Sequence, residues 1–225
     1  MTSTLASHEP VLAVIGGSGK LGKALARRLL KAGYSVAIGS RSSPTAADEA
    51  RSLATELHLS DHALPRVFGM SNEEAARNAS LVILAIPASA YDALLPPLQE
   101  ACAAKIVLST AVPFPLRDTG KSAGEHAQEL LPAAHVIAGL HTVSHVVLEG
   151  DSAVNEDALL VGDDPNDVAL FQEVLTSITG LRAVYGGSLR FARITESLTH
   201  LLIQMNRTYH ATTGIQITGI NTVES

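Results

Sequence analysis

A glycine-rich turn between an apolar run and a helical pattern constrains this chain most strongly. The stretch from Val14 to Leu25 reads VIGGSGKLGKAL, and Gly17, Gly19 and Gly22 match the spacing G-x-G-x-x-G after a strand and at the start of a helix. The glycines permit a tight turn, backbone approach to a pyrophosphate and close helix packing, while the helix start offers free N–H groups. A purely structural glycine turn is the alternative, but the strand-turn-helix context favours a dinucleotide site.

Strands and helices alternate along the first half of the chain. Apolar runs predict strands at 11–15, 35–39, 66–68, 81–86 and 105–109. Helical spacing predicts helices at 20–32, 46–57, 72–78 and 91–101. This order predicts an α/β fold, a Rossmann-type doubly wound parallel sheet with helices on both faces.

The pattern changes near residue 139. A short strand within 152–161, a helix at 165–176, a strand at 181–185 and a long helix at 189–209 indicate a small C-terminal α/β lobe. We therefore expect a nucleotide-binding domain at 9–140 and a small domain at 141–225. No low-complexity linker separates them, so they are expected to pack closely, share a cleft and carry the dimer interface on the second part.

The end of the second predicted strand indicates which dinucleotide binds. An Asp or Glu about twenty residues after the turn holds the ribose 2′-hydroxyl of NAD, but Ser40 and Arg41 occupy this place. A guanidinium can bind a 2′-phosphate with two charge-assisted bonds, which favours NADP. A solvated surface arginine is the alternative.

Three further loops are expected beside the nicotinamide half of the dinucleotide. Ligands of open α/β sheets bind outside the carboxyl ends of the strands, where the segments LAIP and STAVP end the fourth and fifth predicted strands. The segment GLHTVSH lies where the two predicted domains meet. His141 in it can donate to a substrate carbonyl or simply cap a strand end. No nucleophilic triad or metal motif accompanies it, so a cofactor is expected to carry the chemistry.

Charge and cysteine content narrow the partners. The net charge of −6 argues against nucleic acid and against an anionic membrane surface. A single cysteine, Cys102, can build no disulfide framework and no zinc site, which fits a reducing compartment. The longest apolar run, at 81–86, is too short to span a bilayer, and no signal-peptide pattern opens the chain. A cytoplasmic enzyme without a metal is expected.

These segments, in this order, resemble the NADPH-dependent deazaflavin reductases, also called coenzyme F420:NADP oxidoreductases. IGGSGKLGKALA, IGSR, VILAIP, KIVLSTAVP, GLHTVS, VGDD and RITESLTHLLIQMN carry the resemblance, which covers nearly the whole chain after residue 10. It implies a Rossmann domain with a small C-terminal domain, a homodimer, and hydride transfer between NADP(H) and coenzyme F420 in the interdomain cleft.

The resemblance also implies roles for individual residues. Those implied for the pyrophosphate turn are Gly17, Ser18, Gly19, Lys20, Leu21 and Gly22. Ser40 and Arg41 match the 2′-phosphate pair. Those implied for the nicotinamide and the stacked rings are Ile86, Pro87, Ala88, Ala111, His141, Thr142, Val143, Ser144 and His145. The chain departs from the family pattern at Thr45, where a second basic residue is common, and at Ala88 and His145 in the ring pocket.

Two other functions remain open at this stage. One is an NADPH-dependent reductase of a flavin or of a small carbonyl or imine compound on the same fold. The other is a noncatalytic NADP-sensing module. On the last helix, Arg193 and Glu196 have the spacing of an i,i+3 surface pair. The apolar residues Ile194, Leu198, Leu201, Leu202 and Met205 predict a homodimer through this half.

Overall fold

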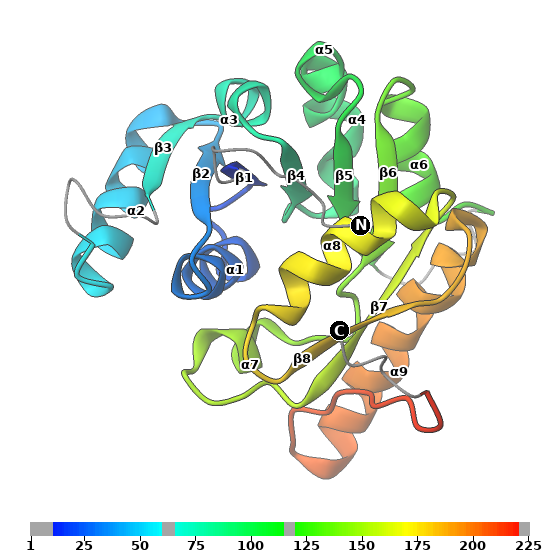
Figure 1. Ribbon diagram of the computed structural model, residues 1–225. Coiled ribbons are helices and arrows are strands. Elements are labelled where there is room, and N and C mark those ends of the chain that lie inside the picture. The colour runs from blue at the N-terminus through cyan, green and yellow to red at the C-terminus, as the bar shows by residue number, and fades with distance from the viewer. Residues whose placement is uncertain (1–10, 60–65, 115–119, 221–225) are drawn as a thin grey trace, which may run out of the picture.

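The computed structural model describes residues 11–59, 66–114 and 120–220, and its centre is a single eight-stranded sheet in the order β3-β2-β1-β4-β5-β6-β7-β8 (Figure 1). The outermost residues of the two predicted domains, 9–10 and 221–225, lie outside the described ranges. The strands are β1 Val11–Ile15, β2 Ser35–Ser40, β3 Val67–Ser71, β4 Leu81–Leu84, β5 Ile106–Ser109, β6 His135–Gly139, β7 Glu156–Gly162 and β8 Leu181–Tyr185.

The first six strands of the sheet are parallel, and β7 turns against β6 before β8 pairs with β7 in parallel. The order 3-2-1-4-5-6 is that of a doubly wound sheet, and it reverses between β1 and β4. The predicted α/β Rossmann-type fold is confirmed. The change of direction at β6–β7 falls beside the predicted boundary at residue 140, and β7 and β8 extend the same sheet.

Helices cover both faces of the sheet because successive residues of each strand point to opposite sides. Leu12 and Val14 pack in a core with α1 Lys20–Lys31, α2 Ser43–Glu56, α7 His145–Glu149 and α8 Pro165–Thr176. Ala13 and Ile15 face the other core, formed by α3 Asn72–Asn78, α4 Tyr91–Leu94, α5 Gln99–Cys102, α6 Ala123–Leu130 and the start of α9 Ala192–Tyr209. In Figure 1, α1 and α8 lie on the side opposite to α3 and α5.

Several predicted bounds were wrong for local reasons. The predicted helix 91–101 is broken into α4, a 3₁₀ turn at Pro96–Leu98, and α5, because consecutive prolines remove N–H donors and clash with the preceding turn. α2 begins at Ser43 rather than 46, because the Ser42 side chain caps the helix and Pro44 suits its first turn. The strand predicted at 81–86 ends at Leu84.

Three elements in the middle of the chain were not predicted, namely α6, β6 and α7. The start of α6 carries a sequence signal, since Ser122 and Glu125 form a capping box. β6 is short and begins with an exposed histidine, so its pattern is weak. α6 and β6 carry the chain to the junction at Leu140, which has a positive φ of 64° although it is not a glycine, and α7 follows this junction.

Candidate functional site

The carboxyl ends of five neighbouring parallel strands meet at one edge of the sheet. Ile15 pairs with Gly39 on one side and with Leu84 on the other, and Leu84 pairs with Ser109. Ser109 in turn pairs with Ala138 of β6. The loops that follow these strands therefore lie together, and the site residues that the sequence predicts lie in these loops or in the ends of the elements that flank them.

Gly16, which the sequence analysis did not single out, makes the tight turn after β1. Its φ is +79°, and a side chain there would meet Cγ2 of Ile86 at 2.5 Å. The N–H groups of Gly16 and Gly17 both donate to the carbonyl oxygen of Gly39, at 3.0 and 3.1 Å. The glycine pair at 16–17 was the available signal. Gly22 allows the close packing that the motif predicts, since a Cβ on it would lie 2.4 Å from the Gly16 carbonyl oxygen.

The start of α1 is open to an anion. Its N-cap is Gly19, which offers no side chain to accept from the first N–H groups, and no acidic residue lies in the first turn. Ser18, Gly19 and Lys20 are exposed. Unpaired N–H groups and the positive end of the helix dipole attract phosphate, so this turn fits the pyrophosphate of a dinucleotide.

A second helix start lies beside Ser40 and Arg41. The Ser40 side chain is buried and its Oγ accepts from the Ser42 N–H at 3.4 Å, while the Arg41 side chain is exposed. Ser42 caps α2, whose first turn contains no acidic residue. The Arg41 guanidinium and this helix start offer positive charge where the predicted 2′-phosphate would lie.

A cavity of about 420 Å³ opens beside the glycine-rich turn, a volume in the range of small-molecule sites. The predicted residues that line it are Leu21, His141, Thr142, Val143, Ser144 and His145. Thr110, Val112 and Leu140, from two of the loops expected there, also line it. The lining residues that sequence analysis did not assign to the site are Thr199, Leu202, Ile203, Asn206 and Thr213. Leu202 had been expected on the apolar face of the last helix, and it is instead buried toward the cavity.

The other predicted residues lie outside the cavity lining. Ile86 is buried over the glycine turn, Pro87 is exposed, Ala88 is half-buried at the start of a 3₁₀ turn, and Ala111 is buried. The buried hydroxyl groups of Tyr91 and Ser109 lie 2.8 Å apart. Burial raises the pKa of Tyr91, so its hydroxyl stays protonated and acts as a structural group at neutral pH.

His141 is 7% exposed, and neither ring nitrogen has a hydrogen-bond partner of good geometry. Burial lowers its pKa to about 4, against a smaller raising effect of the Ser109 backbone. The ring is therefore neutral at neutral pH, with one donor and one acceptor. Because a buried polar group without a partner costs about 1–3 kcal/mol, a bound molecule in the cavity would relieve this cost.

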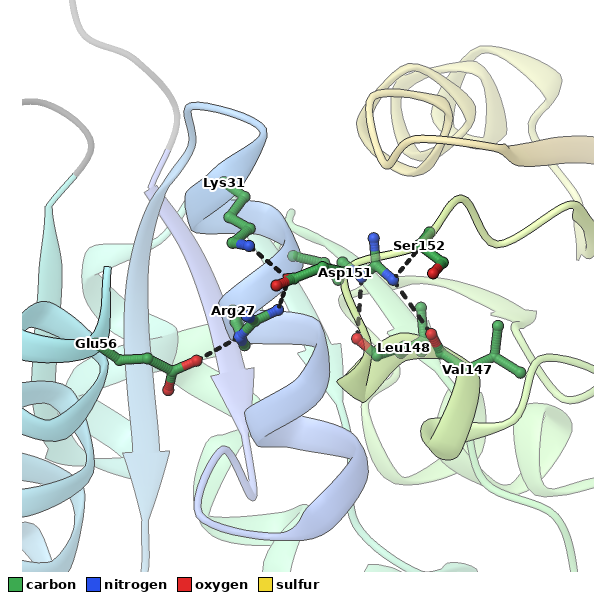
Figure 2. Close-up of polar contacts among 8 residues, drawn as sticks. Arg27, Lys31, Glu56, Val147, Leu148, Asp151 and Ser152 are labelled. Carbon is green, nitrogen blue, oxygen red and sulfur yellow. Dashed lines mark hydrogen bonds and ion pairs between the residues drawn. The ribbon is translucent and has the colours of Figure 1, made fainter. Parts of the chain in front are cut away.

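Arg28 of α1 holds the chain just after the wall formed by residues 140–145, and its acceptors Val147, Leu148 and Ser152 are labelled in Figure 2. Arg28 is 5% exposed and donates to the carbonyl oxygens of Leu148, Val147 and Ser152 at 3.0, 3.2 and 2.7 Å. Burial lowers its pKa from the ordinary arginine value, yet the group remains charged. The helix that begins at the glycine turn thus also holds the far end of α7.

The predicted surface pair of Arg193 with Glu196 is wrong for Glu196. The Glu196 carboxylate is 3% exposed and accepts from the N–H groups of Ala123 and Gly124, at 2.9 and 3.0 Å. It faces inward because α9 packs across the start of α6. Burial raises the pKa of Glu196 to about 7, and the two N–H bonds lower it by less.

Metal ligands and membrane spans were also sought in the part of the chain that the structure describes. No group of three or more His, Cys, Asp or Glu side chains in residues 11–59, 66–114 and 120–220 is placed to hold a metal ion. None of the helices in these ranges has the length and apolar character needed to cross a bilayer.

Comparison with known proteins gives concordant results. A family described as NADP oxidoreductase coenzyme F420-dependent matches residues 11–113. The F420-dependent NADP reductase of Methanocaldococcus jannaschii is 33% identical over 221 residues, which cover 93% of this chain and 98% of the relative. The enzyme of the same name from Methanothermobacter marburgensis is 32% identical over 223 residues, with 93% and 98% of the two chains covered.

Solved structures share the fold over most of the chain. A protein from Arthrobacter sp. FB24, assigned as an F420-dependent NADP reductase, has a TM-score of 0.76 at 23% identity, covering 94% of this chain and 100% of its own. An imine reductase from Bacillus cereus has a TM-score of 0.65 at 19% identity, covering 90% of this chain and 63% of its own. At these identities the likeness concerns the fold alone.

Proposed function

The chain belongs to the coenzyme F420-dependent NADP oxidoreductase family, and we propose that it transfers a hydride between NADP(H) and coenzyme F420 at the carboxyl edge of its sheet. One observation carries the placement of the site. Leu21, in the first turn of the helix that begins at the glycine turn, lines the same cavity as His141 to His145. A ring held in this cavity would therefore lie next to a dinucleotide bound at the turn.

The glycine turn and the start of α2 hold NADP in this proposal. Ser18, Gly19 and Lys20 are exposed at an uncapped helix start, which supports a pyrophosphate site there. Gly17 and Gly22 keep the turn close to α1. The 2′-phosphate site is formed by Ser40 and Arg41, which explains why no acidic residue stands at this position.

The nicotinamide end lies between the loops after β4 and β5. Ile86, Pro87 and Ala88 border one side and Ala111 the other, so that backbone and small side chains leave room for a flat ring. The acceptor ring lies against Thr142, Val143, Ser144 and His145, with the residues of α9 closing the cavity. We retain the division into domains 9–140 and 141–225 as part of the proposal, with the second part completing the acceptor cleft.

The chain's own residues have little acid-base work in this reaction. NADP(H) and the deazaflavin, when bound, supply the hydride donor and the hydride acceptor. The protein fixes the relative position of the two rings, which lowers the free-energy barrier of hydride transfer by several kcal/mol, at most about 7–11. The apolar side chains of Leu21, Leu202 and Ile203 exclude water from the cavity. His141, neutral at neutral pH, offers one N–H to charge that develops on the acceptor ring.

A homodimer formed through α9 is part of the proposal. Ile194 and Leu201 are 60% and 57% exposed on this helix, and Phe114, 69% exposed, stacks on its His200. Such apolar side chains on one helix favour an interface with a second copy. The net charge of −6 supports small-molecule rather than nucleic-acid partners, and the single free cysteine supports a cytoplasmic location.

The decisive experiment mixes the purified protein with NADPH and oxidised F420 and follows the visible absorbance of the deazaflavin. The proposal predicts NADPH-dependent loss of this absorbance, and a slower reaction with NADH. Reduction of a ketone, an imine or a flavin without any reaction of F420 would refute it. Tight NADPH binding with no hydride transfer to any acceptor would instead indicate a noncatalytic sensor.

A further inference from the structure

Four threonine hydroxyl groups line the acceptor cavity, and each already donates its proton within the protein. The acceptors are Leu84 O for Thr110 at 2.9 Å, Asp157 O for Thr142 at 3.2 Å, His141 O for Thr199 at 2.7 Å, and Asn206 Oδ1 for Thr213 at 2.7 Å. A hydroxyl has one proton. These side chains can accept from a bound molecule, but they cannot donate to it without losing an internal bond.

Asn206 is the cavity residue of α9 that retains donors. Its Oδ1 accepts from both the backbone N–H and the hydroxyl of Thr213, each at 2.7 Å. A backbone N–H can only donate, so the side-chain atom that faces it must be the oxygen, which fixes the orientation of the amide. Within the described residues, no protein acceptor bonds to Nδ2, and its two N–H groups are free for a ligand.

The surroundings of Asn206 make these donors useful for recognition. Leu202 and Ile203 on the same helix and Leu21 from α1 supply apolar wall, and Asn206 itself is half-buried. A hydrogen bond formed in such partly desolvated surroundings discriminates strongly, because a ligand without a matching acceptor leaves the amide unpaired. The other side-chain donors of the lining, on His141, Ser144 and His145, come from the 140–145 wall rather than from α9.

We propose that Asn206 is a specificity-determining residue that donates to a carbonyl oxygen on the pyrimidine edge of the hydride acceptor. Thr213 is its positioning residue, because it holds the amide with Nδ2 toward the ligand. This inference rests on the proposed function, since it assumes that the acceptor ring occupies the cavity. The site then selects flat rings that carry an oxygen acceptor on one edge.

The test is a fluorescence titration of oxidised F420 into protein saturated with NADP⁺, a pair that cannot react. Asn206→Asp keeps the oxygen that Thr213 holds and replaces the donor with a negative oxygen, so Kd should rise at least about 10-fold, or ~1.4 kcal/mol. Gln204→Glu makes the same chemical change at an exposed position of α9 outside the cavity lining, and it should leave Kd within about twofold. Asn206→Ser, which loses both amide donors without adding charge, should give an intermediate rise.

A pH series separates ligand contact from a structural role. A carboxyl group regains a donor when it is protonated, and the ordinary Asp pKa is near 3.9, so the Kd ratio of Asn206→Asp to wild type should shrink as pH falls from 7 to 4. Wild-type binding with an unchanged Kd for Asn206→Asp, or an equal and pH-independent rise for Asn206→Asp and Gln204→Glu, would overturn this inference alone. A wild type that binds no F420 would overturn the proposed function together with it.

Discussion

Arg28 donates a hydrogen bond from Nε to the carbonyl oxygen of Leu148 at 3.0 Å, across 120 positions of sequence. Figure 2 shows that ion pairs also tie the segment after Leu148 to α1, because Arg27 and Lys31 both pair with Asp151. These two pairs hold the pKa of Asp151 well below its ordinary value, with Arg27 the larger cause. The ion pairs of Asp151 and the hydrogen bonds of Arg28 differ in burial, since Asp151 is 67% exposed and Arg28 is 5% exposed.

The buried arginine should therefore matter far more than the exposed ion pair. Arg28→Met leaves three carbonyl groups without their donor and should lower the free energy of unfolding by about 2–4 kcal/mol. Lys31→Met on the same helix should lower it by less than about 1 kcal/mol, which urea denaturation of both variants would measure. Arg28→Lys, which keeps the charge, should raise KM for F420 several-fold and leave KM for NADPH within twofold. Equal changes in the two KM values would show that Arg28 does not position the acceptor wall.

Cofactor preference should depend on Arg41. Arg41→Asp removes a charge directed at the 2′-phosphate and should weaken NADPH binding by about 1.5–3 kcal/mol, while NADH binding changes little. Titration of both nucleotides measures this. Arg51→Asp is the matched control, because it makes the same charge change at an exposed position farther along α2. Equal losses for the two nucleotides would contradict the 2′-phosphate assignment.

His141 should assist hydride transfer as a neutral donor. His141→Ala should slow F420 reduction by about 10- to 100-fold without abolishing it, because position and apolar packing supply most of the effect. Its pKa of about 4 keeps the ring neutral at every pH above about 5. The ratio of the wild-type rate to the His141→Ala rate should therefore be constant from pH 5.5 to 8. An inflection of this ratio near 6.5, the ordinary histidine pKa, would contradict the neutral state.

The stability of the protein should depend on pH through the titration of Glu196. A carboxyl group whose pKa is raised to about 7 binds its proton more tightly in the folded than in the unfolded chain, where the pKa is near 4.3. The free energy of unfolding should thus fall as pH rises from about 4 to 7, by about 1–3 kcal/mol, and Glu196→Gln should lack this contribution. Denaturant unfolding at a series of pH values measures the difference between the two proteins. The exposed change Glu100→Gln should show no such trend. A wild-type free energy of unfolding that stays constant or rises relative to that of Glu196→Gln between pH 4 and 7 would refute the assignment.

Assembly should depend on the outer face of α9. Light scattering at micromolar concentration should give twice the 23.5 kDa chain mass for the wild type. Leu201→Asp places a charge on a side chain that is 57% exposed, so it should give the single-chain mass while the fold survives. Thr208→Asp, at an exposed polar position of the same helix, is the control. A monomeric wild type would end the dimer proposal.

The sequence by itself determined the class of fold and the order of most of its elements, but not α6, β6 and α7. Period-two and helical patterns depend on neighbouring residues, so the helices at Asn72–Asn78 and Pro165–Thr176 and the strand at Leu181–Tyr185 were predicted with their observed bounds. The dinucleotide-binding turn could also be predicted, because the glycine spacing reflects steric requirements among residues close in sequence. Gly16 was missed although the glycine pair at 16–17 was a local signal. The sequence could not show that a side chain there would meet Ile86, 70 positions away in the chain.

Only the tertiary structure decided which residues complete the acceptor side of the site. Asn206, Thr199 and Thr213 reach the cavity because α9 packs across the carboxyl edge of the sheet, and the same packing divides the apolar residues of this helix. Leu202 turns inward while Leu201 remains exposed, and Glu196 caps another helix instead of facing water. A local sequence pattern predicts that a helix has an apolar side. Contacts between residues far apart in sequence determine which elements cover this side. The hydrophobic effect that drives this burial has no direction of its own, so the pattern cannot specify the partner.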